Sequence, residues 1–232
     1  MSKTGYYGAR PIDFGVFDLD FVEYMHYMYL PIVIDEGLAR DYQESLPANI
    51  QFADHLIEVV RNYEAVSGMD WKYVYVTARR GYATPGNPLN RPGWHADGFG
   101  TEDVNYVWTD RYPTDFAIGD FGTVSDDHIE SVREFAATIE WETGRGPSDG
   151  PPKVSIEHYP DKSLLRLDDR VIHAAPEIPA PGGERSFFKV SFSNNRYNLK
   201  GNSHNYGLTY DWPMFDRDAV RNDPTKAGGD SV

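Results

Sequence analysis

The sequence predicts a mainly β protein with flanking helices, in which an antiparallel barrel or sandwich is buttressed by N-terminal helices. Two observations favour this class. Short runs of β-forming residues recur from Trp71 onward, and turn-forming residues separate them. One helical pattern, residues 129–139, interrupts these runs. A parallel α/β sheet would need a helix between successive strands, so the antiparallel arrangement is favoured.

The first seventy residues are expected to be mostly helical. Residues 19–30 are dense in aromatic and methionine side chains, and the apolar side chains of residues 52–66 recur at helical spacing until Gly68. Such an apolar stripe is typical of a helix that packs one face against a sheet. We therefore expect residues 1–70 to form a helical support region.

Residues 71–193 are expected to form the β core. The predicted strands are 71–77, 114–121, 153–158, 163–167, 170–173 and 185–193. A long loop rich in Gly, Pro and Asn follows the first of them, over residues 81–93. With 232 residues, of which 40% are hydrophobic, the chain can form one sizeable core. We expect a single domain over residues 1–232, in which 194–232 is a C-terminal extension and tail.

The side chains are strongly acidic overall. The chain has 36 Asp and Glu residues against 22 Lys and Arg residues, which gives a formal net charge of -14. A field of this sign repels phosphate backbones at long range, so bulk binding of nucleic acid is not expected.

Composition also excludes several classes of site. The chain has no cysteine, which excludes disulfides, thiolate zinc sites and iron–sulfur clusters. The mean hydropathy is -0.57, and no apolar run approaches the length of about 18 residues that a membrane-spanning helix needs. The N-terminal residues lack the apolar region of a signal peptide, so we expect a cytoplasmic location and no membrane partner.

The candidate chemistry begins at His95-Ala96-Asp97. Residues i and i+2 of an extended segment point to the same side, so an imidazole and a carboxylate at this spacing can bind one metal ion together. His173 follows Asp97 by 76 positions at the end of a β-run, and Arg185 follows His173 by 12. Two imidazoles and one carboxylate form a facial triad that leaves positions open on Fe(II). A hairpin after His173 would bring back Arg185, whose guanidinium suits a carboxylate.

This order and spacing resemble the Fe(II)/2-oxoglutarate-dependent dioxygenases, with a match that covers residues 71–192. The resemblance implies a double-stranded β-helix, the cupin-like jelly roll. It implies that His95, Asp97 and His173 bind Fe(II). It also implies that 2-oxoglutarate chelates the metal through its keto-acid end, while Arg185 pairs with its distal carboxylate.

One position departs from the family pattern. Family members often carry Ser or Thr two residues after the Arg, and this chain has Phe187 there. A second partner for the distal carboxylate is therefore unassigned by the motif. Tyr75 and Thr77, on the predicted strand 71–77, are the candidates.

The resemblance also implies a reaction. The enzyme would use O2 and 2-oxoglutarate, hydroxylate a C–H bond, and release succinate and CO2. The presence of Asp97 favours oxygenation over halogenation, because the related halogenases replace this carboxylate with a small residue. A zinc hydrolase can use the same three ligands, but it would not explain an Arg placed to anchor a small dicarboxylate.

The expected substrate is a small molecule, either amino-acid-like or nucleotide-like. The loop that leads into His95 is long, as substrate-recognition loops are. Candidates for binding an anionic substrate group are Arg79, Arg80 and Arg91, with plain surface charge as the alternative. Trp94 and Trp108 are candidates for the walls of an apolar pocket, with core packing as the alternative.

Three other functions stay open. A cupin-like metalloprotein without 2-oxoglutarate dependence would release no succinate. An oxygenase of the same kind could act on a protein side chain. A binding or structural jelly roll with a vestigial triad would keep its role when His95 is replaced by Ala. The sequence makes no prediction of oligomeric state.

Overall fold

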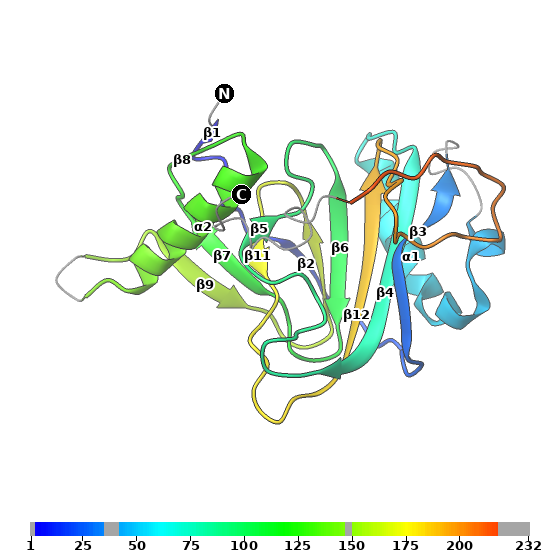
Figure 1. Cartoon of the computed structure of the whole chain (residues 1–232), viewed down its shortest axis with the longest axis horizontal. Helices are drawn as coiled ribbons and strands as arrows, with labels where there is room; N and C mark the ends of the chain where they lie inside the picture. The colour runs from blue at the N-terminus through cyan, green and yellow to red at the C-terminus, as the bar shows by residue number, and fades with distance from the viewer. Residues whose placement is uncertain (1–2, 35–41, 147–149, 218–232) are drawn as a thin grey trace.

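The computed structural model describes residues 3–34, 42–146 and 150–217, and two antiparallel sheets dominate it (Figure 1). In sheet order, the larger sheet consists of β2 (Ile12–Val16), β10 (Ser163–Leu167), β6 (Val104–Thr109), β12 (Gly183–Ser193), β4 (Tyr73–Ala83) and β3 (Met25–Ile34). The smaller sheet consists of β5 (His95–Ala96), β11 (Ile172–Ala174), β7 (Asp115–Gly119) and β9 (Val154–His158). A separate short pair joins β1 (Lys3–Thr4) to β8 (Thr123–Val124).

The chain passes between the two sheets in the order of a jelly roll. It runs through β4 in the larger sheet, β5 in the smaller, β6 in the larger, then β7 and β9 in the smaller. It returns to the larger sheet at β10, to the smaller at β11 and to the larger at β12. This alternation of antiparallel strands defines the double-stranded β-helix. The predicted fold class, a mainly β jelly roll with flanking helices, is confirmed.

The larger sheet has apolar side chains on both faces. Between the sheets lies a cluster that includes Val107, Phe116, Leu165 and Phe187. The opposite face of the larger sheet packs against α1 (Asp54–Val66) in the main core. Because side chains alternate along a strand, Arg185, Phe187 and Lys189 of β12 share the inner face, while the residues between them face α1.

The second helix, α2 (His128–Thr143), covers the outer face of the smaller sheet (Figure 1). The side chain of Asp127 caps its N-terminus by accepting hydrogen bonds from the backbone N–H groups of Ile129 and Glu130. Its apolar stripe packs in a cluster with strands of that sheet. The predicted helix at 129–139 is confirmed. In the described ranges, no helix is long and apolar enough to cross a lipid bilayer.

The helical prediction for the first seventy residues is wrong in its first half. Residues 12–16 and 25–34 form β2 and β3, the two edge strands of the larger sheet. Among the described residues of this region, helix is confined to the short 3-10 turns η1 (Gln43–Ser45) and η2 (Ala48–Ala53) and to α1. The physical reason is that β4 offers β3 a row of backbone partners, and an edge strand accepts Pro31 where a helix interior would not.

Candidate metal centre

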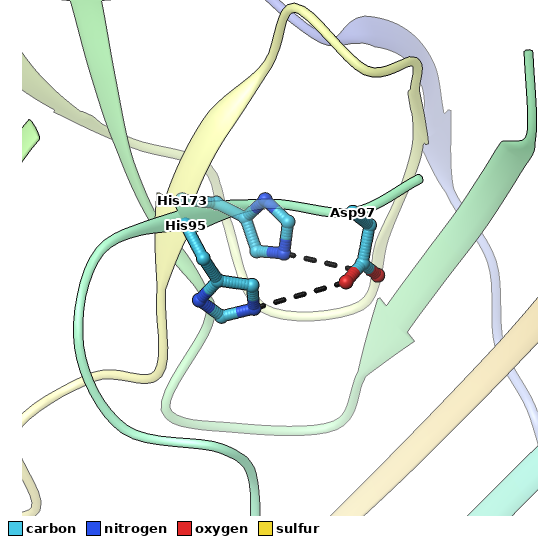
Figure 2. A group of neighbouring side chains, drawn as sticks. All are labelled: His95, Asp97 and His173. Atoms are coloured by element: carbon cyan, nitrogen blue, oxygen red, sulfur yellow. Dashed lines mark ion pairs between the residues drawn. The ribbon is translucent and has the colours of Figure 1, made fainter. Parts of the chain in front are cut away.

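Two histidines lie side by side because their strands pair. His95 on β5 lies directly opposite His173 on β11 in the antiparallel register. Side chains of such a pair project from the same face of the sheet, and the two imidazole centroids are 4.5 Å apart. Asp97 follows β5 at once and turns its carboxylate toward both rings (Figure 2).

The three side chains converge at distances that suit one metal ion. Nε2 of His95 is 3.8 Å from Oδ1 of Asp97, and Nε2 of His173 is 4.0 Å from Oδ2. One ligand atom from each residue lies within 4.8 Å of the others. The structure thus brings together the two imidazoles and the carboxylate that the sequence selected.

Backbone carbonyls orient both imidazoles. Nδ1 of His95 lies 2.8 Å from the carbonyl oxygen of Gly93, and Nδ1 of His173 lies 3.2 Å from that of Val171. When each Nδ1–H donates to its carbonyl, the lone pair of Nε2 is left facing the centre. Burial and the nearby His173 lower the pKa of His95 to about 3, and burial lowers the pKa of His173. Both rings are therefore neutral at pH 7, as metal ligands must be.

Lys189 is a fourth member of the cluster that the sequence reasoning missed. Its Nζ donates to Oδ2 of Asp97 at 3.0 Å and to Oη of Tyr29 at 3.3 Å. Burial alone would raise the pKa of Asp97, but the ammonium of Lys189 holds that pKa well below its usual range. Burial opposes the charge of Lys189, and Asp97 still raises the pKa of the lysine. The sequence signal that could have found it is the alternation of side chains along β12, because Lys189 is four residues from Arg185 and therefore lies on the same face of the strand.

Arg185 is buried on the inner face of β12, as the prediction required. Its Nε donates to the carbonyl of Tyr112 at 3.0 Å, and its Nη1 donates to the carbonyl of Pro88 at 3.0 Å and to Oδ1 of Asn90. These acceptors are all neutral, and Nη2 is buried without a hydrogen-bond partner in the described part of the chain. Burial lowers the pKa of Arg185 to about 10, so the side chain stays charged. A buried cation whose Nη2 still offers two N–H donors suits a small carboxylate.

The two candidate second partners of that carboxylate lie away from Arg185. Arg185 faces Gly81 across the β12–β4 ladder, whereas Thr77 faces Lys189 and Tyr75 faces Ser191. Tyr75 is therefore about 20 Å along the sheet from Arg185, too far to share a carboxylate with it. Its hydroxyl donates to the carbonyl oxygen of Asn195 at 3.0 Å. Thr77 accepts a hydrogen bond from the backbone of Tyr29 at 3.1 Å and lies at the lysine end of the site.

The three candidate arginines separate into two groups. Arg79 faces inward on β4, is half-buried, and donates to the carbonyl oxygen of Leu89 in the long loop. Arg91 lies close enough to lower the pKa of both site histidines, and its Nη2 is 3.1 Å from Nε2 of His128. Arg80 points to the opposite face of the sheet, so it does not reach the site.

Contacts of Arg80 explain its orientation. Its guanidinium pairs with Asp110 and Glu184 and donates to the hydroxyl of Ser186 at 2.7 Å. The proposed role of Arg80 in substrate binding is therefore wrong, because strand alternation places it one residue out of phase with Arg79.

The two candidate tryptophans both pack in hydrophobic clusters. Trp108 is buried in the main core on the α1 side of the larger sheet, and its Nε1 donates to the carbonyl of Phe17 at 2.8 Å. A substrate role for Trp108 is therefore wrong. Trp94 packs against the cluster beneath α2. The core-packing alternative describes both side chains.

Comparison with known proteins shows only distant likeness. No protein-family model matches the chain, and no curated protein matches it. A bsmA homolog from Methylobium petroleophilum PM1 is 14% identical, with a TM-score of 0.34. The match covers 79% of this chain and 65% of that chain. HygX from Streptomyces hygroscopicus, with nickel and 2-oxoglutarate bound, is 11% identical with a TM-score of 0.35 over 83% of this chain and 82% of that one. Because both TM-scores are low, the fold rests on the strand order and the site on its own geometry.

Proposed function

We propose that this protein is an Fe(II)- and 2-oxoglutarate-dependent oxygenase. It hydroxylates a C–H bond of a small-molecule substrate with O2 and releases succinate and CO2. The observation that carries the proposal is the convergence of His95 on β5, Asp97 directly after β5, and His173 on β11, with both Nε2 atoms and the carboxylate facing one point.

The donor set fits the proposed metal. Two neutral imidazoles and one carboxylate are the ligands of a facial triad, and such a triad leaves other positions open for a chelating cosubstrate. The carbonyl oxygens of Gly93 and Val171 hold the rings in the tautomer that metal binding requires. Iron in such a site supplies the redox chemistry that couples decarboxylation of a 2-oxo acid to oxidation of a C–H bond.

The chain also offers an anchor for the cosubstrate. Arg185 lies on the inner face and is charged, its hydrogen-bond acceptors are neutral, and its Nη2 has no hydrogen-bond partner among the residues that the structure describes. We assign the distal carboxylate of 2-oxoglutarate to this guanidinium. The chain thereby fixes one end of the cosubstrate at Arg185 and leaves its keto-acid end to the triad.

The substrate is proposed to bind on the side of the long loop, at Arg79 and Arg91. Arg79 is tied to that loop through Leu89, and Arg91 acts electrostatically on both histidines. One cationic side chain beside the histidines and another on the inner face of the larger sheet favour a substrate that carries an acidic group. An amino-acid-like or nucleotide-like metabolite meets this requirement.

Anaerobic titration of the protein with Fe(II) and 2-oxoglutarate tests the proposal. A weak visible charge-transfer band is expected in the wild type, absent in Asp97→Ala and weakened in Arg185→Ala. His158→Ala is the matched control, because His158 is an exposed histidine that pairs with Asp115 outside the site. Succinate release under air, stimulated by candidate metabolites, then identifies the substrate. A wild type without the band and without succinate release would reject the proposal in favour of a jelly roll that does not use 2-oxoglutarate.

A further inference from the structure

Lys189 is a cation in contact with Asp97 of the triad, and the proposed function does not yet use it. Its Nζ lies 3.0 Å from Oδ2 of Asp97, while Oδ1 of the same carboxylate lies 3.8 Å from Nε2 of His95. The lysine side chain is almost fully buried. One carboxylate therefore faces both a buried ammonium and the point at which the metal ligands converge.

A metal ion and Lys189 together leave the centre with excess positive charge. The two histidines are neutral and Asp97 supplies one negative charge, so a divalent ion beside the ammonium makes the group doubly positive. Like charges repel strongly where water does not screen them. The metal ion and the ammonium thus compete for Asp97 unless another anion lies close to both. The chelating end of a bound 2-oxo acid would supply such an anion, because it is a carboxylate.

Tyr29 holds the ammonium where it is. The ring of Tyr29 lies 4.8 Å from Nζ, and its hydroxyl accepts a hydrogen bond from Lys189. Tyr29 has a positive φ of 49°, which a tyrosine adopts only where its surroundings hold it. Its backbone N–H donates to Thr77, and its ring packs edge-on against Tyr197. Lys189 is therefore fixed beside Asp97, and in the described part of the chain two acceptors engage its three N–H groups, which leaves one over.

We propose that Lys189 binds the metal-chelating carboxylate of the 2-oxo acid and thereby couples metal binding to cosubstrate binding. This inference rests on the proposed function and adds to it. Without cosubstrate, the ammonium pairs with Asp97 and weakens metal binding. With cosubstrate, the chelating carboxylate balances the ammonium and the metal binds more tightly. Lys189 is then a cosubstrate residue separate from Arg185, which takes the distal carboxylate.

Calorimetric titration with Co(II), which is stable in air, measures this coupling in the full-length protein. Co(II) affinity is measured alone, with 2-oxoglutarate, and with glutarate, which keeps both carboxylates and lacks the chelating keto oxygen. In the wild type, 2-oxoglutarate is expected to tighten Co(II) binding by about tenfold or more, and glutarate by less than about twofold.

Lys189→Met is expected to reverse the pattern. Co(II) alone should bind at least about threefold more tightly, because the competing charge is gone, and the enhancement by 2-oxoglutarate should fall below about threefold. Lys189→Arg should keep most of the enhancement. Lys162→Met is the matched control, since Lys162 is an exposed lysine that pairs with Asp18 away from the site. If Lys189→Met does not fold, Lys189→Gln replaces it as the neutral variant that still donates to Asp97.

The outcomes separate the two proposals. A wild type that binds no Co(II) rejects the proposed function itself. If 2-oxoglutarate tightens Co(II) binding equally in the wild type and in the neutral variants, the role of Lys189 is overturned and the proposed function is left intact. A wild type that binds Co(II) with no response to 2-oxoglutarate also overturns the coupling.

Discussion

Breaking the buried Lys189–Asp97 pair is expected to destabilise the metal-free protein strongly. At 3.0 Å and an effective dielectric constant of about 20, the two charges attract by about 5–6 kcal/mol before desolvation is counted. Removing one partner leaves the other charge buried without compensation, which costs about 3–5 kcal/mol. We therefore expect Lys189→Met and Asp97→Ala each to lower the free energy of unfolding by about 3 kcal/mol or more.

Urea unfolding in the presence of a chelator measures these losses. The double variant Asp97→Ala/Lys189→Met should be much more stable than the sum of the two single losses predicts, because it contains no unpaired buried charge. The exposed pair Lys162–Asp18 provides the matched cycle, in which the coupling should be too small to detect. Additive losses in the buried pair, equal to those of the exposed pair, would refute the electrostatic reasoning.

Three further predictions follow from the geometry. The metal-free protein should lose about 2 kcal/mol of stability between about pH 7.5 and pH 5, because burial holds the pKa of His95 near 3 in the folded state, whereas the same imidazole in the unfolded chain takes up a proton below about pH 6.5. Urea unfolding across this range tests the loss, and a free energy of unfolding that does not change with pH would contradict it. Arg185→Ala should weaken 2-oxoglutarate binding by about tenfold or more in calorimetry without changing Co(II) affinity in the absence of cosubstrate, and an equal loss of both would refute the assignment. Trp108→Phe should lower stability by about 1–2 kcal/mol through loss of its hydrogen bond to Phe17, and 2-oxoglutarate affinity should not change. A selective loss of cosubstrate affinity would show that Trp108 contributes to the site.

The β core was predictable because its strands carry strong local signals. Most predicted strands after residue 71 occur within a few residues of their expected bounds, as in β9, β10 and β12. β6 was missed, since its polar and apolar residues give no strong alternation. Residues 25–34 were misassigned because their aromatic and methionine content is compatible with either state. The free edge of β4 decides in favour of a strand, and this partner is invisible to local reasoning.

The site residues that belong to a motif could be predicted, whereas those whose role depends on the direction of the side chain could not. His95, Asp97 and His173 were found because their order and spacing in the sequence match a known motif, and the pairing of β5 with β11 brings the two histidines together. Arg80 was wrongly chosen beside Arg79, because the phase of β4 was not known from the sequence. Lys189 was missed because no motif names it, although it shares the inner face of β12 with Arg185.

Diffraction at the iron absorption edge, from anaerobic crystals soaked with Fe(II) and 2-oxoglutarate, tests the central claim most directly. The account predicts one anomalous peak bonded to Nε2 of His95, Nε2 of His173 and the carboxylate of Asp97, with the distal carboxylate of 2-oxoglutarate on Arg185. A peak at any other group of side chains, or a centre without iron in which Lys189 remains paired to Asp97, would contradict it.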